Sequence, residues 1–348
     1  MSTSVGVIGY GLAGQLFHAP FIASTPGLSL DSVVTRDAAR ADQVAADYPG
    51  TQVVQTVDEL LARDVDLVVV ASPSRFHAGH VRHALTSGRH VVVDKPVAGD
   101  ADEFEALIEL AESRDRRLFV FHNRRWDGDF LTLRQILETG RIGDVHRFET
   151  RMERWRPLGK GGWRESTDPR DLGGLRYDLG PHLVDQALLL FGPVESVQAR
   201  TVALRPVGGQ DDDVIATLLH ESGVATQLSA SLLTAIPAAR FRVLGAAGAA
   251  LLPEGDTQED RLRAGERPGR PGWGLHPGLR AQVVVGEDQD LDEVPYLAGR
   301  WPAFYLGVAD TLHHGAKMPV TPQSALATMR VVDAIGDAAR TCQTVNPR

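Results

Sequence analysis

Short apolar runs alternate with polar, helix-like stretches along the first third of the chain. The runs are rich in valine and are not interrupted by polar positions, as in 67–70. Such strands are typical of a parallel sheet that helices cover on both faces. Strands are expected at 5–8, 30–35, 66–71, 90–93 and 118–121, and helices at 37–48, 57–63, 76–87 and 101–114. The pattern predicts an N-terminal α/β domain with a doubly wound parallel sheet.

After residue 122 helices and strands no longer alternate. Helices are expected at 130–139 and 181–191, an extended segment at 144–155, and strands at 195–204, 213–220, 224–232, 239–244 and 249–252. Successive strands without intervening helices favour an α+β domain with a large open, mostly antiparallel sheet. A last helix would begin with Thr321 as its N-cap and Pro322 at its first position. We expect domains at 1–121 and 122–320, and a C-terminal helix and tail at 321–348 that packs back on the body.

The composition is that of a globular protein. Of the 348 residues 43% are hydrophobic, and the net charge of −9 argues against a nucleic-acid partner, because phosphate binding needs clustered Lys and Arg. The one cysteine, Cys342, cannot form an internal disulfide, which fits a reducing compartment. The N-terminus lacks a leader pattern, and no apolar run approaches the ~20 residues of a membrane span. We therefore expect a cytoplasmic protein without a membrane partner. A metal partner is not expected either, since no Cys cluster or H-E-x-x-H spacing occurs.

A glycine-rich loop follows the first predicted strand. Its sequence, Gly9-Tyr10-Gly11-Leu12-Ala13-Gly14, matches G-x-G-x-x-G and opens a helical segment. The three glycines would permit a tight turn, a close approach of the backbone to a pyrophosphate, and close packing of the helix on the strand. A glycine-rich turn without a cofactor is the alternative, but the strand–turn–helix context favours dinucleotide binding.

The end of the second predicted strand bears on the choice between NAD and NADP. A carboxylate there would bind the ribose 2′-hydroxyl of NAD, whereas an arginine would accept the 2′-phosphate of NADP. The strand ends before Thr35 and Arg36, and Asp37 is expected to cap the next helix. Unless Arg36 is only a solvated surface charge, this arrangement favours NADP over NAD.

Two further segments carry candidate catalytic residues. Lys95 follows the strand at 90–93, and ligands of open α/β sheets bind outside the carboxyl ends of strands. Asp178 and His182 are four residues apart, so a helix that begins near Gly180 would place both on one side of its first turn. A histidine beside a carboxylate is a natural proton acceptor. By themselves, however, Asp178 could be an N-cap and His182 a core histidine.

Together these motifs resemble the Gfo/Idh/MocA family of oxidoreductases over essentially the whole chain. The matching pieces are the loop 9–14, Ser72-Pro73 with His77, 90–96 and 174–182. The resemblance implies that Lys95, Asp178 and His182 are the catalytic set. It also implies that Ser72, Pro73, His77 and Asp94 line the cofactor pocket and that Trp163-Arg164 lie near the nicotinamide. The family usually has Glu before the Lys-Pro pair, where this chain has the shorter Asp94.

Three segments resemble the branch of the family that includes NADP-dependent scyllo-inositol dehydrogenase. They are 17–21, 121–127 and 177–182. Polar hydrogen-bonding side chains near an aromatic ring suit a sugar or polyol, so Asn123, Arg124 and Tyr177 are expected to join Lys95, Asp178 and His182 in binding the substrate. The alternative is a structural ion-pair network of Arg124 with its neighbours. Arg125 and Asp127 are expected to hold the turn between the domains.

These expectations combine into a function. The chain would reversibly oxidise a secondary alcohol of a polyol, inositol or sugar with NADP, or with NAD. His182 or Lys95 would accept the hydroxyl proton, and Asp178 would orient His182 or bind a neighbouring hydroxyl. A glycosidase with a tightly held NAD and a non-catalytic cofactor-binding regulator are the alternatives, and the catalytic set argues against the regulator. A homodimer or homotetramer through the C-terminal sheet is expected, since an exposed apolar sheet face is costly.

Overall fold

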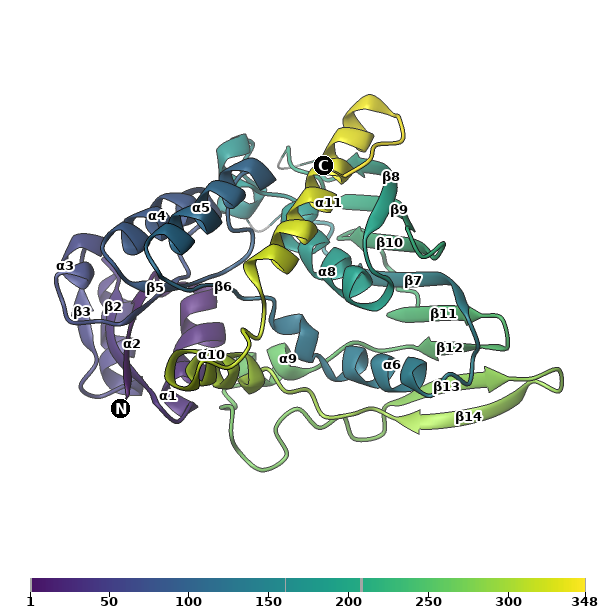
Figure 1. The fold of residues 1–348 in the computed structure, drawn as a ribbon, viewed down its shortest axis with the longest axis horizontal. Coiled ribbons are helices and arrows are strands. Elements are labelled where there is room, and N and C mark those ends of the chain that lie inside the picture. The colour runs from purple at the N-terminus through teal and green to yellow at the C-terminus, as the bar shows by residue number, and fades with distance from the viewer. Residues whose placement is uncertain (1, 160, 207–208, 348) are drawn as a thin grey trace. The chain divides into compact units, whose positions relative to one another are not determined.

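The computed structural model describes residues 2–159, 161–206 and 209–347 (Figure 1). The chain forms two compact units, each built from several segments. The first contains residues 1–122, 260–271 and 301–326, and the second contains 123–259, 272–300 and 327–348. This division differs from the predicted boundaries, which placed 260–271 and 301–320 in the second domain.

The first unit contains a parallel six-stranded sheet in the order β3-β2-β1-β4-β5-β6. Its strands are β1 (Thr3–Ile8), β2 (Leu28–Val34), β3 (Gln52–Val54), β4 (Leu67–Val70), β5 (His90–Val93) and β6 (Leu118–Val120). All side chains of β4 are fully buried, which is why its sequence shows no polar alternation. The order reverses between β1 and β4, as in a Rossmann sheet, and there the loops after these strands form a crevice in such folds. The predicted doubly wound sheet is confirmed.

Helices connect these strands and begin where capping residues allow. They are η1 (Ala13–His18), α1 (Ala19–Ser24), α2 (Ala38–Asp47), α3 (Val57–Leu61), η2 (Ser74–Phe76), α4 (His77–Thr86) and α5 (Ala101–Ser113). The side chains of Asp37, Thr56 and Asp100 accept backbone hydrogen bonds at the starts of α2, α3 and α5. Each cap satisfies a backbone N–H that a helix start leaves unpaired.

The segment 301–326 joins the first unit through aromatic packing. Helix α10 (Pro302–His314) places Phe304 against Phe121, with ring centroids 4.9 Å apart, and Trp301 packs edge-on against Phe17 at 5.8 Å. Trp301 and Phe304 are fully buried. The apolar rings therefore explain why this late segment belongs to the N-terminal fold, a long-range contact that local pattern does not reveal.

The second unit contains an eight-stranded sheet in the order β14-β13-β12-β11-β7-β10-β9-β8. Its strands are β7 (Val145–Glu153), β8 (Val194–Val202), β9 (Asp213–His220), β10 (Ala225–Ser231), β11 (Phe241–Gly245), β12 (Gly248–Leu252), β13 (Arg280–Val285) and β14 (Asp290–Pro295). All neighbours pair antiparallel except β7 and β10, which pair parallel. The predicted large, mostly antiparallel sheet is confirmed.

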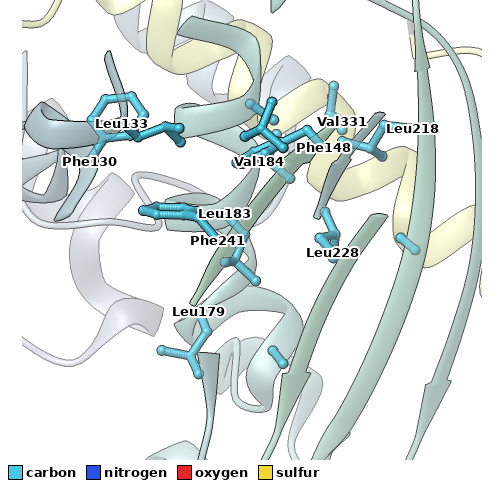
Figure 2. Packing of buried hydrophobic residues seen from close by; sticks show 14 of the residues in the cluster. Phe130, Leu133, Phe148, Leu179, Leu183, Val184, Leu218, Leu228, Phe241 and Val331 are labelled. Carbon is cyan, nitrogen blue, oxygen red and sulfur yellow. The ribbon is translucent and has the colours of Figure 1, made fainter. Parts of the chain in front are cut away.

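Three helices cover one face of this sheet (Figure 1). They are α6 (Gly128–Glu138), α8 (Gly180–Phe191) and α11 (Pro322–Thr341). Figure 2 shows their side chains against those of the strands, among them Phe130, Leu183, Phe148 and Phe241. Phe148 and Phe241 stack with centroids 5.6 Å apart. This core holds α8, which carries His182, on the sheet.

Some elements were not predicted from the pattern. They are η3 (Asn123–Trp126), η4 (Trp163–Glu165), η5 (Pro169–Asp171), α7 (Leu175–Asp178), α9 (Gln258–Arg263), α10, and the strands β3, β13 and β14. Strands β3 and β14 are largely exposed, so they lack the apolar signal of a buried strand. No helix among the described residues is long and apolar enough to cross a membrane.

Candidate functional site

The glycine-rich loop of the first unit has the geometry of a phosphate cradle. Gly9 has a φ of 96°, and a Cβ there would lie 2.8 Å from the carbonyl oxygen of Ala71. A Cβ on Gly14 would overlap the carbonyl oxygen of Gly9. At Gly11, by contrast, a Cβ would meet nothing within 4 Å, so open space lies beside the backbone. The first and third glycines thus pack the loop, while the second leaves it accessible to a pyrophosphate.

The other residues of the loop contribute backbone rather than polar side chains. The ring of Tyr10 is 2% exposed, and burial raises the pKa of its hydroxyl well above the ordinary value. Leu12 and Ala13 carry apolar side chains, and Leu12 is partly exposed. Any contact of this loop with phosphate oxygens therefore rests on main-chain N–H groups at the start of a helix.

The end of β2 presents an exposed cation, Arg36, beside the residue that caps α2. Arg36 is exposed, and its Nε donates to the carbonyl oxygen of Gln55 over 3.3 Å. Asp37 caps α2 by accepting from the backbone N–H of Arg40 at 3.0 Å, and its carboxylate also lies 3.7 Å from the Arg40 side chain. The hydroxyl of Thr35 accepts from the N–H of Asp37 over 3.3 Å. Asp37 thus caps α2 with a side chain that stays 49% exposed, and Arg36 is the exposed cation at the strand end.

Lys95 follows β5, and its backbone is fixed by the residue before it. The N–H of Lys95 donates to Oδ1 of Asp94 over 2.8 Å. The other oxygen, Oδ2, lies 3.9 Å from Nε2 of His18, whose Nδ1 is 2.7 Å from the hydroxyl of Tyr305. His18 and Tyr305 are fully buried. The short Asp94 side chain therefore reaches protein groups, and it fixes the turn that carries Lys95.

The charge of Asp94 is stabilised by its neighbours. Burial by itself would raise the pKa of Asp94, but His18, Lys95 and His77 outweigh it and hold the pKa at about 2. Burial, with the charge of Asp94, raises the pKa of Tyr305 far above its ordinary value. The hydroxyl of Tyr305 and Nδ1 of His18 share a hydrogen bond, and Nε2 of His18 faces Asp94. The hydroxyl of Tyr305, the imidazole of His18 and the carboxylate of Asp94 thus lie in a row.

His77 connects the loops that follow β4 and β5. Its Nδ1 lies 2.7 Å from the carbonyl oxygen of Pro96, and its Nε2 lies 2.7 Å from that of Ser72. Burial lowers the pKa of His77, against the charge of Asp94 and the two carbonyls, which act to raise it. Ser72 also bonds His80 through its hydroxyl, at 3.0 Å. Both nitrogens of His77 therefore contact backbone carbonyls, so His77 positions the two loops. Pro73 lies in the loop after β4, as the N-cap of η2.

The second unit carries the other two predicted catalytic residues. Asp178 ends the short helix α7, and His182 lies in the first turn of α8, where its N–H donates to Leu179 over 3.1 Å. The helix thus begins at Gly180 as expected, but Asp178 belongs to the helix before it. His182 is 7% exposed, whereas the Asp178 side chain is 39% exposed and lies 3.7 Å from Nε of Arg164.

Glycine is required at the start of this segment. Gly174 has a φ of 85°, and a Cβ there would overlap the carboxylate of Asp211. That carboxylate accepts from the N–H of Arg176 over 2.7 Å, and the N–H of Gly174 donates to the carbonyl of Arg164 over 3.0 Å. These contacts join the Trp163-Arg164 turn to α7. The guanidinium of Arg164 lies over the Trp163 ring, 4.5 Å from its centroid.

Buried polar contacts fix α8 to η3 one turn beyond His182. Asp185 forms a bidentate ion pair with Arg125, at 2.8 and 2.6 Å. The amide of Gln186 donates to the carbonyl oxygen of Arg124 over 2.9 Å and accepts from Arg240 over 2.6 Å. These bonds lock the orientation of the first turns of α8.

The predicted substrate-binding residues beside His182 differ in their availability. Arg124 is paired with Asp127 at 3.2 Å and with Glu259 at 3.0 Å. Tyr177 packs against the core and lies under the guanidinium of Arg176, 4.0 Å from its ring centroid. Arg124 and Tyr177 are thus held by protein contacts, as the structural alternative expected for Arg124. Asn123 is buried in the same short helix, η3.

Several residues that shape the site were not found from the sequence. His18 lies beside Asp94, and Glu259 and Asp185 pair with Arg124 and Arg125. Their partners are distant in the chain, so local spacing carries no signal for them. Only the Phe17–Phe21 segment, noted for its family resemblance, pointed toward His18.

Comparison with known proteins decides the family. Residues 3–122 match the model described as "Oxidoreductase family, NAD-binding Rossmann fold", and residues 130–251 match the "GFO/IDH/MocA C-terminal domain". The chain belongs to the Gfo/Idh/MocA oxidoreductases. The first unit is accordingly the NAD(P)-binding Rossmann domain of a Gfo/Idh/MocA oxidoreductase.

Individual Gfo/Idh/MocA relatives match over nearly the full length. The uncharacterized oxidoreductase YdgJ of Escherichia coli is 38% identical over 332 residues, which is 94% of each chain. The scyllo-inositol 2-dehydrogenase (NADP(+)) IolW of Bacillus subtilis is 31% identical over 345 residues, 98% of this chain and 95% of IolW. A solved putative oxidoreductase from Klebsiella pneumoniae is 38% identical with a TM-score of 0.91, covering 99% of this chain and 96% of that one.

Proposed function

We propose that this protein is an NADP-dependent dehydrogenase that oxidises a secondary alcohol of a polyol, inositol or sugar to a ketone. The observation that carries the proposal is the buried imidazole of His182 in the first turn of α8, held there by the Asp185–Arg125 ion pair one turn later. A rigidly placed imidazole is suited to accept a hydroxyl proton. The IolW relative is named as an NADP-dependent inositol dehydrogenase, which supports this substrate class.

Each residue of the catalytic set has a distinct role in this proposal. His182 accepts the proton of the reacting hydroxyl as general base. Lys95, whose turn is fixed by Asp94, hydrogen-bonds the same oxygen and stabilises the negative charge that develops on it. Asp178 orients the substrate through a neighbouring hydroxyl, and Asn123 offers its amide to another. The bound dinucleotide would supply the hydride acceptor.

The cofactor would be held by the first unit. Main-chain N–H groups of the loop 9–14 receive the pyrophosphate, and Gly11 gives the open approach that this needs. Arg36, with Thr35 beside it, would bind the 2′-phosphate of NADP, since its guanidinium is exposed at the end of β2 while Asp37 caps α2. The loops carrying Ser72-Pro73 and Asp94-Lys95, which His77 joins, would contribute to the nicotinamide pocket, as would Trp163-Arg164 of the second unit.

We also propose that a second copy of the chain covers the open face of the second unit's sheet, in a homodimer or homotetramer. Strand register places Leu219, Leu244 and Leu291 in one row on the face opposite the helices. Leu219 and Leu291 are 39% and 58% exposed. Such a row is costly to leave in water.

Absorbance at 340 nm tests the proposed reaction. Purified protein is incubated with NADP⁺ or NAD⁺ and a panel of inositols, aldoses and alditols, beside Lys95→Met and the exposed-lysine control Lys317→Met. We expect reduction of NADP⁺ by the unaltered protein and the control, and its loss in Lys95→Met. NADPH binding without any hydride transfer across the panel, in all three proteins, would contradict the proposal.

A further inference from the structure

One arginine of the second unit interacts electrostatically with Asp178 and has no role in the function proposed above. Arg154 follows β7 directly, and the strand ladder continues through it: its N–H donates to Ser231 over 2.8 Å and its carbonyl accepts from Thr234 over 3.1 Å. Side chains alternate along a strand, so Arg154 shares a face with Met152, which packs against the helix-covered core. Glu153 lies on the other face, where it accepts from Ser229.

The charge of Arg154 interacts with those of two carboxylates, Glu259 and Asp178. The residue is half-buried. Burial lowers the pKa of Arg154, the charges of Glu259 and Asp178 raise it, and those of Arg124 and Arg156 lower it. The guanidinium thus lies within electrostatic range of the carboxylate proposed to orient the substrate.

Both of these carboxylates are already engaged by other arginines. Glu259 lies 3.0 Å from Arg124, and Asp178 lies 3.7 Å from Arg164. Within the part of the chain that the structure describes, no acceptor bonds the Arg154 guanidinium and no carboxylate oxygen lies within 4.0 Å of it. Its five N–H donors therefore have no acceptor among the residues that the structure describes. A half-buried guanidinium without such an acceptor is stabilised most strongly when an anion from solution binds it.

We propose that Arg154 binds an oxyanion on the substrate, so that the oxidised sugar or polyol carries a carboxylate or a phosphate ester. This inference rests on the proposed dehydrogenase function and narrows its substrate class. A guanidinium presents two parallel N–H groups that match the oxygen pair of a carboxylate or phosphate, whereas a neutral hydroxyl offers it no negative charge. The bound anion fixes one end of the substrate, while Asp178 and His182 face the hydroxyl to be oxidised.

Steady-state kinetics with matched substrates tests the assignment. Glucuronate, galacturonate and glucose 6-phosphate are compared with glucose and galactose, in the unaltered protein, Arg154→Gln and the exposed-arginine control Arg82→Gln. We expect the acids to be preferred, and Arg154→Gln to raise their KM roughly 10-fold to 100-fold, as for loss of a charge-assisted hydrogen bond. With the neutral sugars, Arg154→Gln should change KM less than about 3-fold, because a hydrogen bond to a neutral hydroxyl contributes little to binding. A preference for glucuronate or galacturonate would identify the oxyanion as a carboxylate, and a preference for glucose 6-phosphate would identify it as a phosphate ester.

Two results would overturn the inference. One is an unaltered protein that uses the neutral sugars as well as the acids. The other is an Arg154→Gln variant that loses both classes of substrate equally. Arg154→Lys keeps the charge and most of the stem, so it should fold and retain part of the preference for acids even if the glutamine variant is unstable.

Calorimetry on the protein saturated with NADP⁺ separates this inference from the proposed reaction. Binding of glucuronate or glucose 6-phosphate that weakens in Arg154→Gln but not in Arg82→Gln supports the oxyanion site even if no hydride is transferred. Hydride transfer from neutral sugars without any Arg154-dependent binding of acids refutes the oxyanion site and leaves the dehydrogenase standing.

Discussion

Replacing Asp94 by Asn removes the carboxylate that fixes the turn of Lys95. The pKa of Asp94 falls from 3.8 to about 2 in the folded protein. At 1.36 kcal/mol per pKa unit, its charge contributes about 2 kcal/mol to the stability of the first unit. The side chain is only 18% exposed, so solvent screening reduces this value little. We expect Asp94→Asn to lower the free energy of unfolding by about 2 kcal/mol at neutral pH.

Hydrogen exchange read by mass spectrometry measures this loss in the first unit itself. The amides of Leu67–Val70 in β4 and Val91–Val93 in β5 belong to fully buried residues, so they exchange through large-scale opening. A loss of about 2 kcal/mol speeds their exchange about 30-fold, since 1.4 kcal/mol is a factor of about 10. Asp42→Asn, at an exposed position of α2, is the control and should leave these rates unchanged.

The direction of the Asp94 pKa shift determines how the stability loss depends on pH. A depressed folded-state pKa means that the stabilisation is fully present above the unfolded value of 3.8 and is lost as the pH falls through about 2. The difference between the two proteins should therefore be constant from pH 7 to about pH 4 and shrink below it. In a double-mutant cycle with His18→Gln, the double variant should lose less than the sum of the single losses. Equal exchange rates in Asp94→Asn and the unaltered protein at pH 7 would refute the reasoning.

Three further predictions concern the cofactor, the helix that carries His182, and assembly. Arg36→Ala should weaken NADPH binding roughly 10-fold to 100-fold, with NADH binding nearly unchanged, in a fluorescence titration that uses Arg40→Ala for comparison; equal loss of both cofactors would contradict a 2′-phosphate role. Asp185→Asn should cost about 3 kcal/mol in urea unfolding, because it leaves Arg125 buried without its carboxylate, and an unchanged midpoint would disprove this. Leu219→Arg should shift the sedimentation coefficient from oligomer toward monomer, and an unaltered protein that is already monomeric would exclude assembly through this face.

Local pattern was sufficient to predict the elements with buried strands or strong caps. The fully apolar strand β4 and the helix capped by Asp37 were predicted close to their observed bounds. Exposed strands such as β14 escaped prediction, because pairing at the edge of a sheet needs no apolar face. The aromatic packing that joins α10 to the first unit also escaped, since Phe304 and Phe121 are far apart in the chain.

The candidate site follows the same division. The phosphate loop and the spacing of Asp178 and His182 are local, so motif and helical period revealed them. The contact between His18 and Asp94, the pairing of Glu259 with Arg124 and the position of Arg154 depend on the tertiary fold. A sequence shows that these charged residues exist, but it does not show which charges face one another.

The central claim is a net transfer of hydride from a substrate carbon to NADP⁺, and isotope transfer measures it directly. An alcohol found active at 340 nm is prepared with deuterium at the carbon that bears the reacting hydroxyl, and the products are read by mass spectrometry in the unaltered protein and Lys95→Met. The account predicts one deuterium in NADPH for each ketone formed, and its loss in Lys95→Met. Deuterium that returns to the sugar without net NADPH, or label in NADPH that is unaffected by Lys95→Met, would contradict it.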